Sequence, residues 1–322
     1  MHPFLKEYLE WYEQAINAYG AGVAGRRYEP PYRGIALIGM GGSGIVNDII
    51  YSITYAELEV PVVVIKDFNL PRWVGRGWLV VAVSYSGNTV ETLLAVKEAL
   101  GRGCCVATVS SGGDLARVSR SEGIPHVVIE GGRTPRSSLP SLLVSTLRLL
   151  EELGVHTSVD VLKDIEVLKD VEGSLRAAED LANALRGVYP FFIANTRYLP
   201  LALRAKNEFN ENAKALAKAA ALPEWGHNDV VGWEGRKDGV AAVIFREPGD
   251  DLMGFAAELL RGVGARVVDV VLSEGGYVRN VLKYSQVVGI ASVLRALSEG
   301  LDPVKTVTIA RYRGFLKGLL ER

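Results

Sequence analysis

The segment Leu79–Thr92 constrains the fold and the chemistry of this chain more than any other. It passes from an apolar run through a hydroxyl-rich turn directly into the helix-favouring stretch 92–100. A turn at that position presents backbone N–H groups at the positive end of a helix dipole. Because Ser84, Ser86 and Thr89 add hydroxyl groups around a glycine there, the segment predicts a cradle for a phosphate dianion.

A helix cap is the alternative interpretation of the same turn. Asn88 can serve as the N-cap, with Glu91 three residues later completing a capping box. That interpretation explains Asn88 and Glu91 but leaves the three hydroxyl groups around Gly87 unexplained. Ser and Thr are common caps, yet one cap needs only one of them. We therefore favour the phosphate cradle.

Strand-like and helix-like segments alternate through most of the chain. The apolar runs lie at residues 34–39, 60–66, 79–84, 104–110 and 125–130 in a first block, and at 188–195, 240–245 and 266–272 in a second. Runs that are apolar throughout, rather than at every second residue, are typical of parallel strands covered on both faces. The pattern predicts an α/β fold with two doubly wound domains, each a mostly parallel sheet flanked by helices.

A length of 322 residues also favours two domains over one. We expect an N-terminal helix and a first domain over residues 1–153. A helical connector and a second domain are expected over residues 154–322. No internal repeat is apparent in the sequence, so the likeness of the two domains is inferred from the pattern of elements alone.

Charge and hydropathy exclude several classes of function. Lys and Arg number 36 against 37 Asp and Glu, which gives a formal net charge of −1, and no basic cluster offers a surface for nucleic acid. No apolar stretch approaches the ~18 residues of a membrane span. Lys6 and Glu7 interrupt the N-terminal segment, so it does not resemble a secretory signal.

The cysteines point to a reducing compartment. Cys104 and Cys105 are adjacent on a predicted strand, where neighbouring side chains point to opposite faces and make poor disulfide partners. Two cysteines with no histidine at ligand spacing do not make a zinc site. We expect reduced thiols in a cytoplasmic protein and no metal site.

The glycine-rich segment Gly39–Gly44 follows the first predicted strand and has the spacing of a dinucleotide-binding fingerprint. Such a fold also needs an acidic residue at the end of the second strand. The nearest candidate is Asp67, which lies further along the chain than the fingerprint requires. A tight strand-to-helix turn alone also requires glycine. The same glycines would let a sugar ring approach the backbone closely, so an NAD site and a sugar site are both open at this point.

Arg136 stands in a segment rich in Pro and Ser, just before a helix expected over residues 139–153. It could contact a phosphate or sugar oxygen, or stabilise an anionic intermediate. An exposed arginine at a helix start is the alternative. That end of a helix disfavours a cation unless an anion also binds there.

The second block contains candidates for proton transfer. Glu208 and Glu211 are one helical turn apart and share a face, and either could be a solvated acid on that helix. Asn210 and Asn212 beside Glu211 are poor helix formers, so something other than helix propensity holds them there. His227 lies in a loop rich in Gly, Asn and Asp. It is the candidate if the chemistry needs imidazole.

These segments resemble a known family. The turn Ser84–Thr92 is similar to the signature of the sugar isomerase (SIS) domain, whose members bind phosphosugars there. With Asn210–Lys214, Gly226–Asp229, the glycine-rich turn and Arg136 after a proline, the chain resembles the bifunctional phosphoglucose/phosphomannose isomerases over nearly its whole length. The resemblance favours a sugar site over NAD and a functional Arg136.

The resemblance implies a metal-free aldose–ketose isomerase without a cofactor, acting between glucose 6-phosphate or mannose 6-phosphate and fructose 6-phosphate through a cis-enediolate. Glu211 would move a proton between C2 and C1, and His227, from the partner subunit of a homodimer, would open the sugar ring. Lys317 would assist, with Arg313 as a competitor for that role, and Arg136 would stabilise the enediolate. The substrate phosphate would be held by Gly42, Ser43, Ser84, Ser86 and Thr89.

Other classes of function are weaker. A non-catalytic SIS module that senses phosphosugars and regulates transcription would carry a helix-turn-helix domain, for which no basic segment is spare. The N-terminal helix, with Glu7, Glu10 and Glu13, has the wrong charge for DNA. An amino-sugar isomerase would need a nitrogen-donor partner domain or a different loop around the base. We therefore expect hexose 6-phosphates as partners, and neither nucleic acid nor a membrane.

Overall fold

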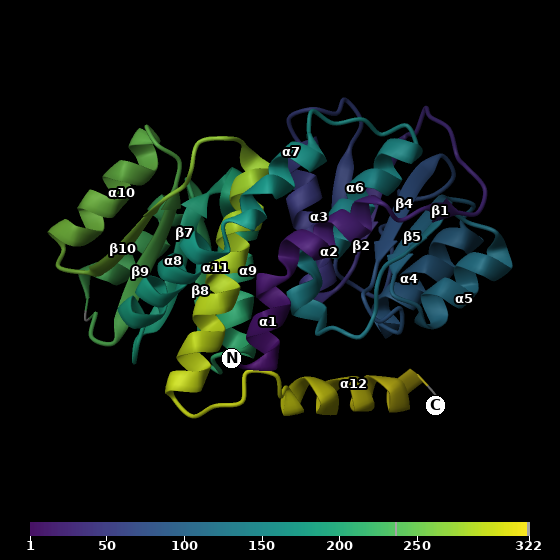
Figure 1. The fold of residues 1–322 in the computed structure, drawn as a ribbon. Coiled ribbons are helices and arrows are strands. Elements are labelled where there is room, and N and C mark those ends of the chain that lie inside the picture. The colour runs from purple at the N-terminus through teal and green to yellow at the C-terminus, as the bar shows by residue number, and fades with distance from the viewer. Residues whose placement is uncertain (236, 321–322) are drawn as a thin grey trace. The chain divides into compact units, whose positions relative to one another are not determined.

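The computed structural model describes residues 1–235 and 237–320 (Figure 1). Contacts between Cα atoms divide the chain into two compact units. The N-terminal unit comprises Glu10–Leu162 and the segment that begins at Thr306, and the C-terminal unit comprises Met1–Leu9 and Lys163–Lys305. None of the helices in the described ranges combines the length and the hydropathy that a bilayer-spanning helix requires.

The N-terminal unit is built around a sheet that is parallel except at one edge. Its strands are β1 (Val23–Ala24), β2 (Gly34–Ile38), β3 (Val62–Ile65), β4 (Trp78–Val83), β5 (Cys105–Ser110) and β6 (His126–Val128). Their order across the sheet is β1-β6-β5-β4-β2-β3, and only the pair of β1 with β6 is antiparallel within the described residues. The central strands β2 and β4 are buried along their whole length.

Helices cover both faces of this sheet. They are α2 (Trp11–Tyr19), α3 (Gly41–Thr54), α4 (Val90–Gly101), α5 (Gly113–Glu122) and α6 (Leu139–Glu152), with the short η1 (Pro135–Ser138) before α6. The segment from Thr306 that groups with this unit contains α12 (Val307–Leu320). The chain crosses from β2 to β3 through α3 and from β4 to β5 through α4, in opposite directions along the sheet. Because such crossovers are right-handed, the two helices lie on opposite faces.

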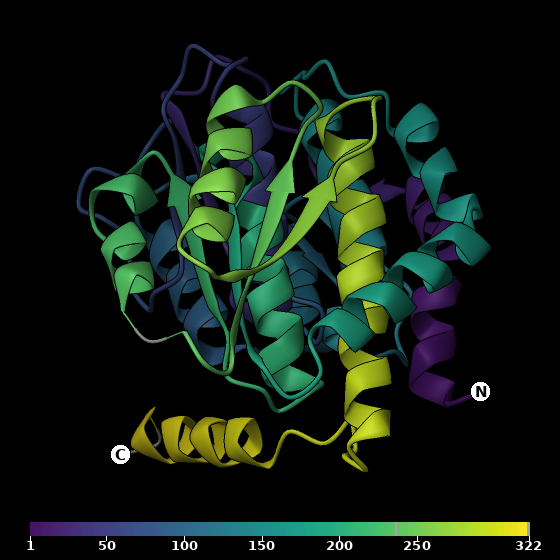
Figure 2. The same cartoon turned by 90° about the vertical axis from the view of Figure 1, so that its left-hand side faces the viewer.

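The C-terminal unit contains a second parallel sheet (Figure 2). Its strands are β7 (Tyr189–Asn195), β8 (Lys218–Leu222), β9 (Val240–Arg246) and β10 (Arg266–Val271). Its α-helices are α1 (Pro3–Leu9), α7 (Val161–Ile165), α8 (Val171–Ala184), α9 (Leu199–Glu211), α10 (Asp251–Gly262) and α11 (Tyr277–Ser298), of which α7 begins just before the unit boundary. Its short 3-10 helices are η2 (Glu166–Lys169), η3 (Thr196–Tyr198), η4 (Glu224–His227) and η5 (Asp229–Glu234).

Helices also cover both faces of this second sheet. Phe191 packs in a cluster with α10, whereas the ring of the next residue, Phe192, contacts that of Phe209 in α9. The alternation of strand side chains thus places α10 and α9 on opposite faces.

The two sheets repeat one topology. The order β5-β4-β2-β3 in the N-terminal unit corresponds to β10-β9-β7-β8 in the C-terminal unit. In each, a helix follows the first strand and another follows the third. The predicted α/β fold of two doubly wound, mostly parallel sheets is therefore confirmed, and the likeness of the two halves is visible in the topology although no sequence repeat is apparent.

Residues 1–9 belong to the C-terminal unit, although the order of elements in the sequence predicts that they belong to the first domain. The reason is packing, because α1 buries Phe4 and Tyr8 and contacts α11. A Cβ atom on Gly289 of α11 would lie 2.2 Å from Cε1 of Tyr8, so the glycine makes room for the ring. The segment from Thr306 likewise groups with the N-terminal unit.

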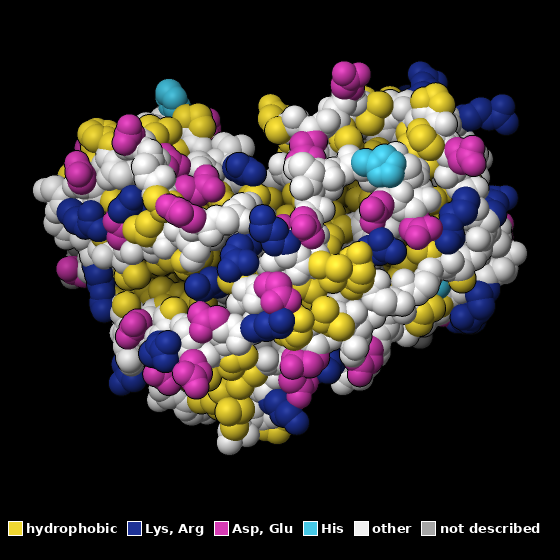
Figure 3. All heavy atoms as spheres, turned by 45° about the horizontal axis from the view of Figure 1, so that its top comes forward, with side chains coloured by type: hydrophobic (Ala, Val, Ile, Leu, Met, Phe, Trp, Pro, Cys, Tyr) yellow, Lys and Arg dark blue, Asp and Glu magenta, His cyan; other side chains and the backbone are white. Residues whose placement is uncertain are grey.

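Charged side chains of both signs are interspersed over the face shown in Figure 3. Neither Lys and Arg nor Asp and Glu gather there into one large patch. This distribution agrees with the near-balance of acidic and basic residues in the sequence.

Candidate active site

The phosphate-binding candidates of the N-terminal unit gather at the carboxyl ends of its parallel strands. This edge of a doubly wound sheet is where ligands bind in such folds. The hydroxyl groups of Ser84, after β4, and Thr89, before α4, are 3.0 Å apart. Gly87 between them has φ +66°, and a Cβ there would lie 1.9 Å from the carbonyl oxygen of Gly112. Only glycine fits this turn.

The capping-box interpretation of the turn is wrong. The side-chain oxygen of Asn88 accepts a hydrogen bond of 3.0 Å from the backbone N–H of Asp114 at the start of α5. Thr89 is the N-cap residue of α4, and within the described chain its side chain makes no capping hydrogen bond. The N–H groups of the first turn of α4 are therefore not taken by the cap that the sequence suggested.

The glycine-rich turn after β2 lies against the same loop. The hydroxyl oxygen of Ser43, in the first turn of α3, accepts a hydrogen bond of 3.2 Å from the backbone N–H of Tyr85. A Cβ on Gly39 would lie 2.8 Å from the carbonyl oxygen of Val83. This glycine thus serves the close packing of two strand ends.

Arg136 lies beside the glycine-rich turn, on a third segment. A Cβ on Gly42 would lie 3.5 Å from the carbonyl oxygen of Pro135 and 3.6 Å from Cα of Arg136. Arg136 is only 7% exposed. It is therefore not the exposed arginine at a helix start that was the alternative, and burial of its charge calls for anionic or polar partners.

Ser86 differs from the other hydroxyl residues of the turn. It is exposed, and its hydroxyl oxygen accepts a hydrogen bond of 3.2 Å from the backbone N–H of Asn88. In this bond the Ser86 hydroxyl acts as an acceptor, so its own proton can be donated in a further hydrogen bond. Ser86 thus lies in the same turn as Ser84 and Thr89, on its solvent side.

Lys66 is a charged residue near the cradle that sequence reasoning missed. It follows β3, its Nζ forms an ion pair with Asp48 of α3, and a Cβ on Gly44 would lie 3.2 Å from its Cε. Burial raises the pKa of Asp48 above its ordinary value, and the ammonium of Lys66 opposes that rise. The sequence feature that could have identified Lys66 is its position directly after the apolar run of a strand.

In the C-terminal unit, Glu211 is the last residue of α9 and is partly exposed. Lys214 follows with φ +50°, and its Nζ donates hydrogen bonds to the carbonyl oxygens of Glu211 at 2.9 Å and Asp302 at 2.5 Å. A cation at carbonyl groups is favourable at the C-terminal end of a helix. Glu211 therefore stands on a well-anchored helix end.

Glu208 is in a different environment from Glu211, although one helical turn separates them. Its side chain is 1% exposed and forms an ion pair with Arg204. It accepts hydrogen bonds from the phenol of Tyr8 at 2.7 Å and from the amide of Asn212 at 2.5 Å. Glu208 is therefore a buried structural residue and not a solvated acid, and the network explains why Asn212 is tolerated there.

His227 is exposed at the end of η4. The loop that carries it is anchored by the buried rings of Trp225 and Trp233. The amide of Asn228 donates to Oε1 of Glu224 at 2.6 Å, and its oxygen accepts from the backbone N–H of Asp229 at 2.6 Å. The imidazole of His227 is therefore exposed to solvent, while the buried rings and these hydrogen bonds fix the backbone of its loop.

The candidates near the C-terminus lie on α12. Arg313 is exposed on this helix. The backbone of Lys317 lies within α12, but its side chain is outside the described part of the structure. Among the described residues, no group of three or more His, Cys, Asp or Glu side chains could hold a metal ion.

The residues thus divide by unit. The structure brings together six predicted residues at one sheet edge of the N-terminal unit: Gly42, Ser43, Ser84, Ser86, Thr89 and Arg136. Glu211 and His227 belong to the C-terminal unit. Tyr85, to which sequence reasoning gave no role, contacts several loops of the phosphate-binding edge.

Comparison with known proteins places this chain among its relatives. A family model described as the bacterial phospho-glucose isomerase C-terminal SIS domain matches residues 175–316. The bifunctional phosphoglucose/phosphomannose isomerase of Aquifex aeolicus is 34% identical over 297 residues, which are 89% of this chain and 91% of that protein. The protein of the same name from Pyrobaculum aerophilum is 32% identical over 320 residues, 96% of this chain and 97% of that one. The chain belongs to the bifunctional phosphoglucose/phosphomannose isomerase family.

A relative with a different name is about as similar in sequence to this chain, a member of the isomerase family, as the two relatives above. The D-glucosamine-6-phosphate 4-epimerase of Sulfolobus acidocaldarius is 33% identical over 232 residues, 70% of each chain. Among solved structures, a putative phosphosugar isomerase from Silicibacter pomeroyi has a TM-score of 0.71 at 18% identity, covering 94% of this chain and 100% of that one. At that identity the likeness shows the fold alone.

Proposed function

We propose that this chain is an aldose–ketose isomerase that converts glucose 6-phosphate and mannose 6-phosphate into fructose 6-phosphate. The near full-length likeness to the bifunctional isomerases is the observation that carries this proposal. The hydroxyl-rich turn at the start of α4 supports it, since it offers donors for a phosphate and the N-cap residue Thr89 makes no capping hydrogen bond within the described chain.

The substrate phosphate binds at the edge of the N-terminal sheet. Hydroxyl groups and backbone N–H groups there can donate to its oxygens, and hydrogen bonds to a charged acceptor are the stronger kind. The donors in this proposal are the side chains of Ser43, Ser84, Ser86 and Thr89 and the backbone of Gly42.

Ring opening and isomerisation need only acid–base groups. His227, with Lys317 assisting, moves the proton of the C1 hydroxyl to the ring oxygen. The Glu211 carboxylate then takes the C2 proton; the C2–H electron pair becomes the C1–C2 double bond, and O1 carries the negative charge. Glu211 returns the proton to C1 while the proton on O2 passes to O1, which leaves the ketone at C2. The guanidinium of Arg136 stabilises the enediolate oxygens.

One site can serve both aldoses. Glucose 6-phosphate and mannose 6-phosphate differ only in configuration at C2, and removal of the C2 proton gives the same planar enediolate from each. A site that tolerates rotation about the C2–C3 bond therefore accepts both. The partially exposed position of Glu211 at a helix end is compatible with proton removal from either epimer.

The working unit in this proposal is a cytoplasmic homodimer in which His227 serves the site of the partner subunit. The exposure of His227 on a well-supported loop is the observation that favours this arrangement. Cys104 and Cys105 are free thiols, which suits a reducing compartment.

A coupled assay of fructose 6-phosphate formation tests the proposal. We expect comparable rates from glucose 6-phosphate and mannose 6-phosphate, and the same rates in the presence of EDTA. Activity that is lost in EDTA and restored by zinc or magnesium would contradict the acid–base route. Inertness toward both aldoses, with epimerisation of glucosamine 6-phosphate at C4, would instead assign the chain the activity named for its Sulfolobus relative.

A further inference from the structure

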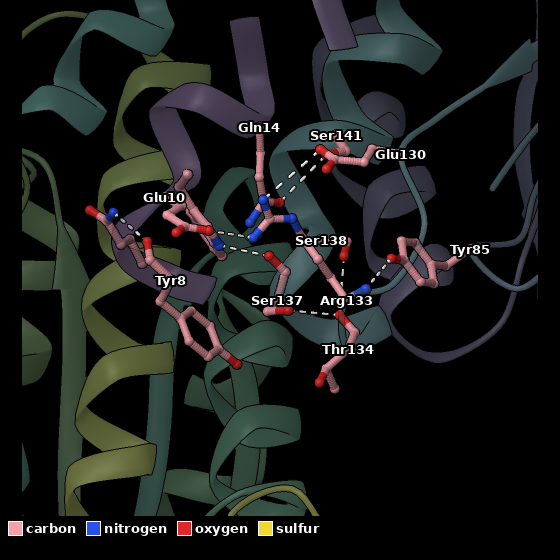
Figure 4. Close-up of polar contacts among 12 residues, drawn as sticks. Tyr8, Glu10, Gln14, Tyr85, Glu130, Arg133, Thr134, Ser137, Ser138 and Ser141 are labelled. Atoms are coloured by element: carbon pink, nitrogen blue, oxygen red, sulfur yellow. Dashed lines mark hydrogen bonds and ion pairs between the residues drawn. The ribbon is translucent and has the colours of Figure 1, made fainter. Parts of the chain in front are cut away.

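Tyr85 makes hydrogen bonds to three separate segments at the phosphate-binding edge of the N-terminal unit. Its backbone N–H donates to the hydroxyl of Ser43 at 3.2 Å, in the first turn of α3. Its carbonyl oxygen accepts from the N–H and the hydroxyl of Ser111 at 2.8 and 2.7 Å, in the loop after β5. Its phenol oxygen accepts from the backbone N–H of Arg133 at 2.9 Å, in the segment before α6 (Figure 4).

The phenol belongs to a buried side chain, and its hydrogen bond with Arg133 is partly buried. Tyr85 is 6% exposed, and it stands between Ser84 and Ser86 in the turn that is proposed to hold the phosphate. One side chain therefore connects that turn to the chain segment that carries Arg136. A backbone N–H buried without such an acceptor is costly, so the contact is expected to persist.

The segment that Tyr85 holds is internally rigid. The carbonyl oxygen of Thr134 accepts hydrogen bonds from the N–H and hydroxyl of Ser137 at 3.0 and 2.7 Å, and from the hydroxyl of Ser138 at 3.1 Å. These hydrogen bonds stabilise the short helix η1, which contains Arg136. A displacement of Arg133 is thereby passed on to Arg136.

A second set of contacts fixes the same segment from α2 and the residue before it. Nη1 of Arg133 donates to Oε2 of Glu10 at 2.6 Å, and its Nη2 lies 3.9 Å from Oε2 of Glu130 (Figure 4). Nε1 of Trp11 donates to the carbonyl oxygen of Ser137 at 2.7 Å. The segment is thus anchored by Glu10 and by Trp11 of α2, and at its start the Tyr85 contact connects it to the phosphate turn.

We propose that Tyr85 is a positioning residue that sets the distance between the phosphate-binding turn and Arg136. The inference rests on the proposed function of Arg136. In a hexose 6-phosphate the phosphate on C6 and the reacting carbons C1 and C2 are at opposite ends of the molecule. A cation that stabilises the enediolate must therefore be held at a fixed distance from the phosphate site. The phenol of Tyr85 fixes that distance through the N–H of Arg133.

The variant Tyr85→Phe isolates this contact, because it keeps the ring and both backbone bonds and removes only the phenol oxygen. Tyr32→Phe is the matched control: Tyr32 is 7% exposed, lies in the same unit and loses a phenol contact of 2.8 Å to the backbone carbonyl of Leu153. Both variants should lose similar stability. Only Tyr85→Phe should lower kcat, by about tenfold or more, because small misplacement of a catalytic group has effects of that size.

Inorganic phosphate and a double variant separate positioning from a general structural effect. The inhibition constant of inorganic phosphate should change by less than roughly twofold in Tyr85→Phe, because the hydroxyl donors of the cradle remain. In an Arg136→Ala background, Tyr85→Phe should have almost no further effect on kcat, since the group that it positions is gone. Unchanged kcat in Tyr85→Phe, or an equal loss in both backgrounds, overturns the proposal.

Hydrogen exchange distinguishes failure of this proposal from failure of the proposed function. If Arg136→Ala retains full activity, or if the chain has no isomerase activity, the proposed function fails at that point. The Tyr85 contact is then judged by amide exchange over residues 131–138. Faster exchange in Tyr85→Phe than in Tyr32→Phe supports the positioning of the segment by the phenol, and equal exchange in the two variants overturns it.

Discussion

The phenol of Tyr8 donates a hydrogen bond of 2.7 Å to the buried carboxylate of Glu208. This contact distinguishes two glutamates that the sequence leaves equivalent, because Glu208 and Glu211 share a helix face. Glu208 is committed to a network with Tyr8, Arg204 and Asn212. Glu211, at the end of the same helix, is partly exposed. The structure thus supports a structural role for Glu208, and the assignment of Glu211 to proton transfer stays a prediction.

Replacement of Glu208 should reduce stability strongly. In Glu208→Gln the buried guanidinium of Arg204 loses the negative charge of Glu208, and removal of one partner of a buried ion pair costs about 3–5 kcal/mol. Urea unfolding of the variant measures this loss. The exposed Glu258 on α10 provides the control, since Glu258→Gln should change the free energy of unfolding by less than about 0.5 kcal/mol. Equal stability of the two variants would show that the ion pair does not support the fold.

Gly289 should resist replacement because of the ring of Tyr8. In Gly289→Ala the new Cβ would lie 2.2 Å from Cε1 of Tyr8, and overpacking of this kind costs about 1–3 kcal/mol. At Gly254 on α10, a Cβ would have no heavy atom of the described chain within 4 Å beyond its own neighbours and the backbone of its own helix. Gly254→Ala should therefore raise the free energy of unfolding by up to about 1 kcal/mol. A stabilised Gly289→Ala would mean that α1 does not pack as described.

The hydroxyl groups of the turn before α4 should contribute to phosphate binding. Ser84→Ala and Thr89→Val each remove a donor, and a hydrogen bond to a charged group contributes about 1.5–3 kcal/mol. We expect a higher KM and weaker inhibition by phosphosugar analogues in both. Thr92→Val is the control, since Thr92 is buried one turn further into α4 and its hydroxyl has no hydrogen-bond partner among the described residues. If Ser84→Ala and Thr89→Val bind substrate as tightly as the wild type does, these hydroxyl groups do not hold the phosphate.

His126 should make the N-terminal unit less stable in acid. Its Nδ1 lies 2.6 Å from the hydroxyl of Thr108, and burial lowers the pKa of the imidazole below its ordinary value of 6.5. The folded state therefore favours the neutral ring. That contribution is complete above pH 6.5 and is lost as the pH falls through the lower folded pKa. A pKa that is lower by one in the folded state than in the unfolded state corresponds to about 1.4 kcal/mol of stability.

Unfolding by urea at two pH values measures the effect of His126. The wild type should lose more stability between pH values of about 7.5 and 5 than His126→Asn, whose amide can keep the contact with Thr108 but does not titrate. Equal losses in the two proteins would show that protonation of this ring does not limit acid stability.

Local signals predict the strand, turn and helix that carry the N-terminal part of the candidate site. The buried strand, the hydroxyl turn and the helix after Thr89 are all properties of neighbouring residues, so the sequence predicts them directly. The role of Asn88 is different, because its partner is the N–H of Asp114 on another helix. A capping box is a local pattern, and a contact across loops replaced it here.

Two elements could not be predicted because they depend on distant partners. The run Lys218–Leu222 is rich in alanine and favours a helix by propensity, yet it forms β8 because it pairs with β7. Burial of Phe4 and Tyr8 groups α1 with a helix far along the chain. Tertiary pairing decides both cases, and no pattern within either segment indicates the partner.

In the proposed reaction, Glu211 is the base that moves the proton between C2 and C1. Transfer of deuterium from D₂O into the C2 position of glucose 6-phosphate, followed by NMR, tests it most directly. Glu211→Gln should bind phosphosugars nearly as tightly as the wild type and should exchange the C2 proton about 10²- to 10⁴-fold more slowly, while Glu258→Gln exchanges at the wild-type rate. Exchange in Glu211→Gln as fast as in the wild type would contradict the account.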